Sequence, residues 1–236
     1  MTDLFYAVLY QPLLNILVFF YNVVPGHDIG VAIILLTAFI RLILWPLMGQ
    51  SIKGQKAMQS LQPKIQALKE QHKGDKQKLA QATMELYKAE KINPLSSCLP
   101  LLIQMPILIA LYWVLSAGLK SEKLDLLYPF ITNPGTIKTM AFGFLDLAQK
   151  SWVLAILAGA AQYWQSKMLP MMPPAVKGEG SKDEGMAAMM NKQMLYMMPL
   201  MTVIIGGTLP GGLTFYWFLS TALTGLQQVI MFRKKT

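Results

Sequence analysis

The sequence predicts an all-α polytopic membrane protein. Hydrophobic residues make up 54% of the 236-residue chain and charged residues only 14%, against roughly 25% charged residues in ordinary globular domains. Mean hydropathy is +0.41. The charges also cluster, which leaves uncharged runs of about 20 residues, the length of helix that crosses a hydrocarbon core about 30 Å thick. A chain of this composition cannot cover itself with a charged surface, so a water-soluble globule is excluded.

Five segments have the length and composition of transmembrane helices, and together they predict a five-helix transmembrane core. The last two are separated by Pro210, Gly211 and Gly212, a combination typical of a tight turn, so they are expected to form a helical hairpin. All five belong to a single domain, residues 1–236. The predicted spans are 29–48, 95–118, 151–169, 194–209 and 211–232.

The positive charges predict how these spans are oriented, because cytoplasmic loops of membrane proteins carry an excess of Lys and Arg. Sixteen Lys and Arg residues lie in 51–93, 167–192 and the C-terminal tail, against four in the loop 119–150. We therefore expect segments 51–92 and 170–192 and the C-terminus in the cytoplasm, and the loop 119–150 to be extracytoplasmic. The net charge of +9 fits basic loops that face anionic lipid, and no specific nucleic-acid partner is expected.

The cytoplasmic segment 51–92 is predicted to be a helical hairpin. Apolar residues recur at helical spacing on both sides of a break at Gly74 and Asp75, which is the pattern of two antiparallel helices joined at Lys73–Asp75. Residues 51–93 carry nine lysines and four acidic residues. A solvated hairpin held by its own apolar seam explains the spacing but leaves this positive charge unexplained.

Residues 2–24 allow two interpretations. Gln11, Asn15 and Asn22 form one polar stripe on an otherwise apolar helix. An amphipathic helix of this kind can lie along the outer membrane interface, and this is the interpretation we favour. The segment is also long enough to be a sixth span, and the charge distribution does not decide between the two.

Arg41 is the most informative residue because it lies within the first predicted span. An arginine at the centre of a transmembrane helix costs about 2.5–3.5 kcal/mol on insertion scales. None of the five spans contains Asp or Glu, so the guanidinium needs water, backbone carbonyls or neutral side chains. Snorkelling to the headgroups is one solution. The solution we favour is a hydrated cavity that opens to the cytoplasm. Neutral candidate partners are Gln104, Gln162, Gln165, Thr202, Thr214, Ser220 and Thr221.

Catalytic and metal chemistry are not expected from this sequence. Cys98 is the single cysteine, and the two histidines are His27 and His72, too few for a Cys/His metal cluster. No predicted span offers a carboxylate, a His or a Cys–His pair for acid–base or nucleophilic work. We therefore expect a protein that is not an enzyme and that needs no cofactor and no metal.

Five motifs follow one another in order along nearly the whole chain. They are FIRLILWPL (39–47), MQSLQPKIQALKE (58–70), NPLSSCLPLLIQMPILIALYWVL (93–115), AQYWQSKM (161–168) and LPGGLTFYWFLSTALTGLQQ (209–228). Each motif is weakly diagnostic alone, but together they resemble the YidC/Oxa/Alb family of membrane protein insertases. The chain resembles a minimal YidC-type core of that family.

The resemblance implies a membrane protein insertase and chaperone in the cell membrane. Such a protein moves short hydrophilic tails of nascent membrane proteins through a hydrated, cytoplasm-open groove and releases their hydrophobic segments into lipid. Arg41 matches the groove arginine, Gln162 and Trp217 match groove-lining positions, and Gln104 and Tyr216 are expected neighbours. The implied partners are nascent membrane proteins, the lipid bilayer, the translating ribosome and the Sec translocon.

A small-solute transporter or channel is the main alternative from another functional class. It would predict internal repeats and broken helices paired between two halves of the chain, and the sequence has no such repeat. An assembly factor without insertase activity is a further alternative, which an insertion assay separates from an insertase.

Overall fold

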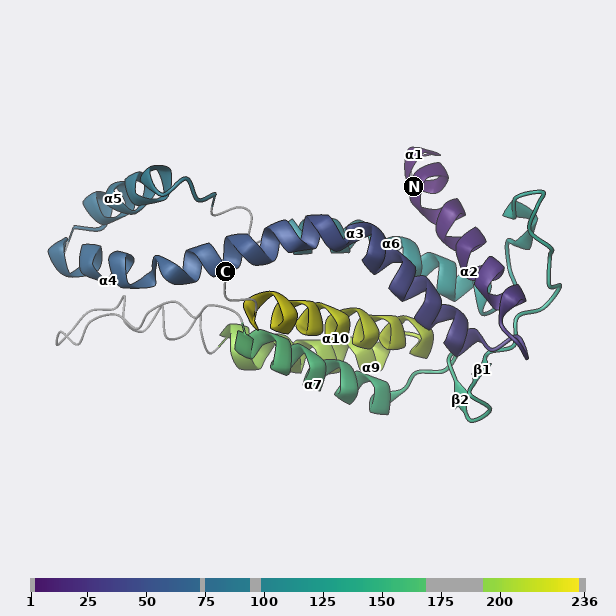
Figure 1. Cartoon of the computed structure of the whole chain (residues 1–236). Coiled ribbons are helices and arrows are strands. Elements are labelled where there is room, and N and C mark those ends of the chain that lie inside the picture. The colour runs from purple at the N-terminus through teal and green to yellow at the C-terminus, as the bar shows by residue number, and fades with distance from the viewer. Residues whose placement is uncertain (1–2, 73–74, 94–98, 169–192, 234–236) are drawn as a thin grey trace.

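Helices dominate the computed structural model, which describes residues 3–72, 75–93, 99–168 and 193–233 (Figure 1). The predicted helical class is thus confirmed, while the five-helix transmembrane core stays a prediction. Among the described residues, two helices are long and apolar enough to cross a membrane, Asp3–Val23 and Ile29–Ser60. Leu102–Gly118 and Gln193–Thr208 are shorter apolar helical stretches. The predicted loop 170–192 lies outside the described residues.

Besides the helices, the structure has a small β-hairpin in the segment 119–150, which the sequence did not predict. Strands β1 (Met140–Ala141) and β2 (Leu145–Asp146) pair antiparallel. The turn between them is made possible by positive φ angles at Phe142 (56°) and Gly143 (79°). Two-residue strands carry too little alternation of polar and apolar residues to be predicted from sequence.

The N-terminal helix consists of α1 (Asp3–Phe5), a π-helical turn (Tyr6–Tyr10) and α2 (Gln11–Val23). Helix α3 (Ile29–Ser60) follows after a short turn. The remaining helices are α4 (Gln62–Gln71), α5 (Lys76–Ala89), α6 (Leu99–Gly118), a 3-10 turn (Leu124–Leu126), α7 (Trp152–Met168), a π-helical turn (Gln193–Met197), α9 (Met198–Thr208) and α10 (Gly211–Arg233).

Helix α3 continues without interruption past the predicted end of the first span at residue 48. Asp28 caps its N-terminus, since one carboxylate oxygen accepts a hydrogen bond from the Val31 N–H at 3.0 Å and the other accepts from the Phe142 N–H at 2.5 Å. Pro46 lies inside the helix and cannot donate to the carbonyl four residues before it. Figure 1 shows α3 changing direction along its length, as expected of a proline-containing helix.

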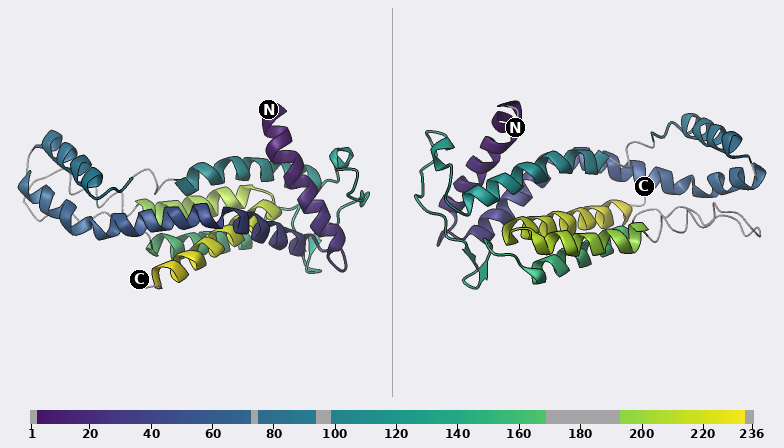
Figure 2. Two further views of the ribbon diagram at one scale, coloured as in Figure 1. Left: turned by 45° about the horizontal axis from the view of Figure 1, so that its top comes forward. Right: turned by 180° about the vertical axis from the view of Figure 1, so that it is seen from behind.

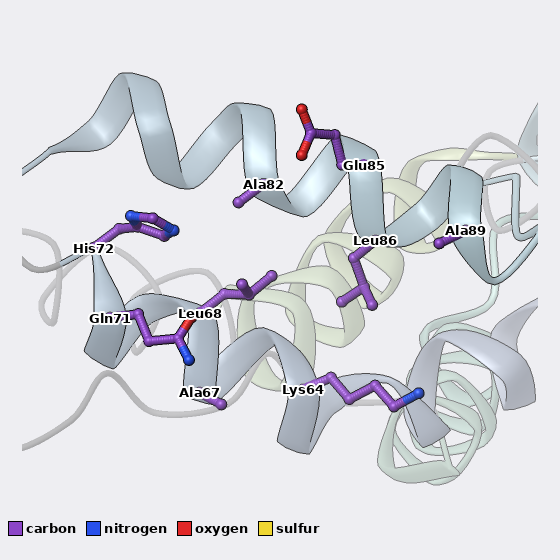
Figure 3. Close-up of a pocket in the computed structure, with 9 residues that line it drawn as sticks. All are labelled: Lys64, Ala67, Leu68, Gln71, His72, Ala82, Glu85, Leu86 and Ala89. Carbon is purple, nitrogen blue, oxygen red and sulfur yellow. The ribbon is translucent and has the colours of Figure 1, made fainter.

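Helices α4 and α5 flank the predicted turn of the hairpin and contact each other. Lys64 forms an ion pair with Glu90 near one end of the pair. Asp75 caps α5, and the hydrogen bond from the Lys78 N–H lowers the pKa of its carboxyl group, so the cap stays charged at neutral pH. An open concavity of about 560 Å³ lies between the two helices, with Leu68 and Leu86 projecting into the space between them (Figure 3).

Helices α7, α9 and α10 pack side by side, as the views in Figures 1 and 2 show. Glycines make the close approaches possible, because a small residue lets two helix backbones come near each other. Gly159 faces Val203 across the α7–α9 contact, and Gly207 lies against the indole of Trp152, where an added Cβ would come within 2.5 Å of the ring. On α10, Gly225 lies against Trp164.

The turn between α9 and α10 is held by backbone hydrogen bonds to the end of the segment 119–150. The N–H of Gly211 donates to the carbonyl of Gln149, and that of Gly212 donates to the carbonyl of Leu147, each at 2.8 Å. A Cβ on Gly211 would stand 2.7 Å from the Gln149 carbonyl oxygen, which is backbone and cannot rotate away. The predicted tight turn is therefore also an anchor for the preceding loop.

Replacing Gly211 with alanine is expected to destabilise the protein by about 1–3 kcal/mol, the usual cost of overpacking. The measurement is thermal unfolding of the purified chain in detergent. Gly49→Ala is the matched control, because a Cβ there meets only Met231 at 3.7 Å, an ordinary contact. Alanine in place of a mid-helix glycine should be neutral or stabilising by up to about 1 kcal/mol. Equal unfolding temperatures for the two variants would contradict the anchoring role of this turn.

The polar stripe of the N-terminal helix faces the segment 119–150. Gln11 donates to the Leu126 carbonyl at 3.1 Å, and Asn22 donates to the Thr132 carbonyl at 2.7 Å. Asn15 lies between them and is 1% exposed. The stripe is therefore accounted for by contacts within the protein, so its polarity alone no longer distinguishes an interfacial helix from a sixth span.

Candidate functional site around Arg41

The guanidinium of Arg41 points from α3 toward α10. Its Nη2 donates to the backbone carbonyl of Ser220 at 2.6 Å and to the Ser220 hydroxyl. Its Nη1 is buried and has no hydrogen-bond partner among the described residues. Ser220 is one of the neutral partners expected from the sequence. It provides hydrogen-bond acceptors for Nη2 but not for Nη1. A buried guanidinium N–H without a partner is costly, so this nitrogen marks the place where water or a bound anion would be most favourable.

Tyr216 and Gln104 lie next to this charge. Tyr216 precedes Ser220 by one helical turn on α10, is 1% exposed and is within electrostatic range of Arg41. Gln104 on α6 donates from Nε2 to the Tyr216 hydroxyl at 2.9 Å. Three of the predicted site residues, on three different helices, are thus brought together. Gln104 and Tyr216, which share this hydrogen bond, are 112 residues apart in the chain.

A line of polar side chains continues from Ser220 along the face of α10 that contacts α3. Thr224 donates to the Ser220 carbonyl at 2.8 Å. Gln227 donates to the Trp45 carbonyl at 3.3 Å, and Gln228 donates to the Gln55 side-chain oxygen, also at 3.3 Å. These glutamines were not among the predicted site residues. Their spacing of seven and eight residues from Ser220 was a usable signal, since it places them on the same helix face.

In the described part of the chain, neither Gln162 nor Trp217 forms a hydrogen bond or a cation–π contact with Arg41. Both are half-buried, Gln162 on α7 and Trp217 on α10. Trp217 follows Tyr216 directly, so its side chain leaves α10 about 100° around the helix axis from the tyrosine. Their assignment to a groove therefore stays a prediction. No group of three or more His, Cys, Asp or Glu residues placed to hold a metal ion occurs in the described residues.

Comparison with known proteins identifies the family. The family model described as "60Kd inner membrane protein" matches residues 19–236. A protein of Fusobacterium nucleatum named membrane protein insertase YidC is 32% identical over 97% of this chain and 98% of its own length. Proteins of the same name from Aeromonas salmonicida and Geobacter metallireducens are 38% and 34% identical, over 95% and 94% of this chain. The chain spans 36% of the length of each of these two relatives.

The match extends over most of the chain and includes Arg41, α6 and α10, the elements that build the site described above. The apolar helices and the family together identify a membrane protein. The family resemblance predicted from the five sequence motifs is confirmed. This chain belongs to the family of the 60Kd inner membrane protein, the YidC/Oxa family.

Proposed function

We propose that this chain is a membrane protein insertase without catalytic chemistry. Its substrates are nascent membrane proteins with short hydrophilic tails, which pass through a hydrated groove open to the cytoplasm before their hydrophobic segments enter lipid. The observation that carries the proposal is the buried guanidinium of Arg41, whose Nη1 lacks a partner among the described residues. The relatives named membrane protein insertase YidC support the same function.

The groove is proposed to lie within a five-helix core made of α3, α6, α7, α9 and α10. Support comes from the polar residues that gather at the α3–α10 contact in an otherwise apolar set of helices. Moving a polar tail across hydrocarbon costs several kcal/mol for each unsatisfied polar group. A wet path that reaches Arg41 shortens that barrier, and its fixed positive charge attracts acidic tails, since an arginine does not deprotonate in proteins.

Roles in the groove are proposed for four further residues. Gln104 and Tyr216 are proposed to form the polar side of the groove beside Arg41. The 2.9 Å hydrogen bond between them, which fixes both side chains, supports this role. Gln162 and Trp217 line the path farther from the charge. Half-burial leaves part of each side chain accessible to a passing peptide.

The proposed orientation has α4, α5 and the C-terminus in the cytoplasm of a cell whose plasma membrane holds the chain. It rests on the excess of Lys and Arg in these segments. The basic hairpin, with the concavity between its helices (Figure 3), is the proposed contact for a translating ribosome or the Sec translocon.

The N-terminal helix is proposed to lie along the outer interface. Residues 123–132 of the segment 119–150 run along this helix. The Lys123 ammonium donates a hydrogen bond to the Tyr6 hydroxyl near its start, and Asn22 near its end donates to the Thr132 carbonyl. Irregular backbone exposed to lipid does not occur in the hydrocarbon region, because its polar groups would lack partners. The helix and the loop beside it are therefore best accommodated together at the headgroup level.

The experiment that tests the function is reconstitution of the purified full chain into liposomes with a single-span substrate that carries an acidic tail. The expected result is that the tail becomes protected from added protease only in liposomes that contain the chain. Protection no greater than in empty liposomes would contradict the insertase. Release of a small solute trapped in the same liposomes tests the alternative of a transporter or channel. No observation in the described part of the structure favours that alternative.

A further inference from the structure

The β-hairpin of the segment 119–150 exposes large apolar side chains. It lies at the end of the molecule where α3 and α7 begin (Figure 1). Phe144 is 77% exposed, and Met140 and Phe142 are exposed as well. Water is an unfavourable surrounding for apolar surface. A group of such side chains on a short hairpin therefore calls for a partner outside the protein's own core.

The turn of the hairpin holds Phe142 in a strained backbone conformation. Its φ angle is 56°, in the left-handed region that bulky aromatic residues rarely adopt. The Phe142 N–H donates to the Asp28 carboxylate at 2.5 Å, and its ring lies edge to face with that of Phe215, with centroids 6.0 Å apart. The ring of Phe144 lies next to it, at 6.3 Å between centroids. Strain that the surrounding structure maintains is typical of functional segments, and here it fixes Phe144 outside the core.

Asp28 places the hairpin at the level where an apolar helix begins. This residue caps α3, and the stretch Ile29–Ser60, long and apolar enough to cross a membrane, starts directly after it. Soon after β2, helix α7 begins with the exposed residues Trp152 and Val153. An exposed tryptophan at the end of a membrane helix is typical of the headgroup level. The hairpin and these residues thus lie at the same end of the apolar helices.

The backbone of the hairpin can leave water because several of its N–H groups have partners within the protein. The Phe144 N–H donates to the Ala141 carbonyl at 3.2 Å, and the Leu147 N–H donates to the Thr139 carbonyl at 2.9 Å. Irregular backbone is excluded from lipid when its polar groups lack partners. These hydrogen bonds, together with that of Phe142 to Asp28, reduce this obstacle.

The charges in and next to the hairpin cancel. Lys138 and Lys150 flank it, Asp146 lies on β2, and Asp28 bonds to the turn. Two positive and two negative charges leave no net attraction for an anionic group. The apolar side chains are therefore expected to provide the binding energy, whatever the charge of the membrane.

We propose that the β-hairpin inserts Phe144 and Met140 into the headgroup level of the lipid bilayer, at the surface where α3 begins. In the orientation proposed above, this is the outer surface. Insertion fixes the depth of α3 through Asp28, and it fixes the turn between α9 and α10 through the bonds from Gly211 and Gly212. The contact depends on the membrane location of the chain and not on insertase activity, so the two fail separately.

The first test measures the surroundings of residue 144 in liposomes of phosphatidylcholine. Cys98→Ser removes the single cysteine, and Phe144→Cys then carries a nitroxide spin label. Oxygen concentrates in lipid and a water-soluble nickel complex is excluded from it, so the ratio of their collisions with the label reports its depth. The label at residue 144 should collide mainly with oxygen.

Met84→Cys is the matched control for the first test. Met84 is an exposed apolar residue on α5, in the helical hairpin expected in the cytoplasm, so its label should collide mainly with nickel. Equal collision ratios at residues 84 and 144 would overturn the proposal.

A second test asks whether the Phe144 side chain holds the hairpin in lipid. The label is moved to Met140→Cys, and Phe144→Asp is added. A phenylalanine side chain favours apolar surroundings over water by at least about tenfold, so the label at residue 140 should shift from lipid to water. Because Phe144 is exposed, this variant should keep its Tm in detergent.

Phe130→Asp is the matched control for the second test. Phe130 is 80% exposed but lies outside the β-hairpin, so the label at residue 140 should stay in lipid. An unchanged position of that label in Phe144→Asp would overturn the proposal. Insertion only after phosphatidylglycerol is added would also overturn it, because charge would then carry the contact. Dipolar broadening between labels at residue 144 would do the same, because a second copy of the chain would then cover the hairpin.

Discussion

Replacing Arg41 with alanine is expected to lower the rate of insertion of an acidic-tailed substrate at least about tenfold. An attraction between unit charges 4 Å apart amounts to about 4 kcal/mol at an effective dielectric constant of 20, well above the 1.4 kcal/mol that corresponds to tenfold. The measurement is protease protection of the substrate in liposomes that contain either wild type or the variant.

Folding of the Arg41→Ala variant should survive, because the Ser220 carbonyl retains its hydrogen bond from Thr224. The change also removes a buried charge that is only half satisfied, which is neutral or favourable for stability. Equal unfolding temperatures of variant and wild type in detergent are therefore expected, and they separate a role in insertion from a role in folding.

Two comparisons isolate the charge of Arg41. Arg41→Lys keeps the charge and should keep most of the activity. Lys167→Ala removes a charge of the same sign from the exposed end of α7 and should have little effect. A substrate whose acidic tail residues are replaced by their amides should depend less on Arg41. An equal loss for both substrates would show that the arginine does not act through attraction of the tail.

Replacing Asn15 with alanine is expected to destabilise the protein by about 2–3 kcal/mol, roughly 5–10 °C in Tm. Asn15 is 1% exposed, and its side chain donates to the carbonyls of Gln11 at 2.7 Å and Leu126 at 3.2 Å. Its oxygen accepts from the Tyr128 N–H at 2.6 Å. The truncation leaves that partly buried N–H without its partner, and the measurement is thermal unfolding in detergent.

Asn22→Ala is the matched control for Asn15. Asn22 makes a single hydrogen bond, to the Thr132 carbonyl, in an exposed setting, where water can replace the lost partner. Its Tm should fall by no more than about 2 °C. If the two variants unfold at the same temperature, Asn15 does not hold the loop 119–150 to the N-terminal helix.

Local features of the sequence were enough to predict the helical class, the membrane location, the family and the exceptional position of Arg41. The physical reason is that the cost of burying a charge and the length needed to cross hydrocarbon are properties of a single segment. The turn at Pro210–Gly212 was equally predictable, because its residue types favour that geometry wherever they occur.

Only the tertiary structure decided which groups meet. Ser220 bonds to Arg41 across 179 residues of sequence, and no spacing rule selects it over the other neutral side chains, because the choice depends on how α10 is rotated against α3. The spacing of Gln227 and Gln228 places them on the same face of α10 as Ser220, but the sequence does not show that this face meets α3. The polar stripe of the N-terminal helix was visible in the sequence, but its partner, the loop 119–150, became known only when the two were packed together.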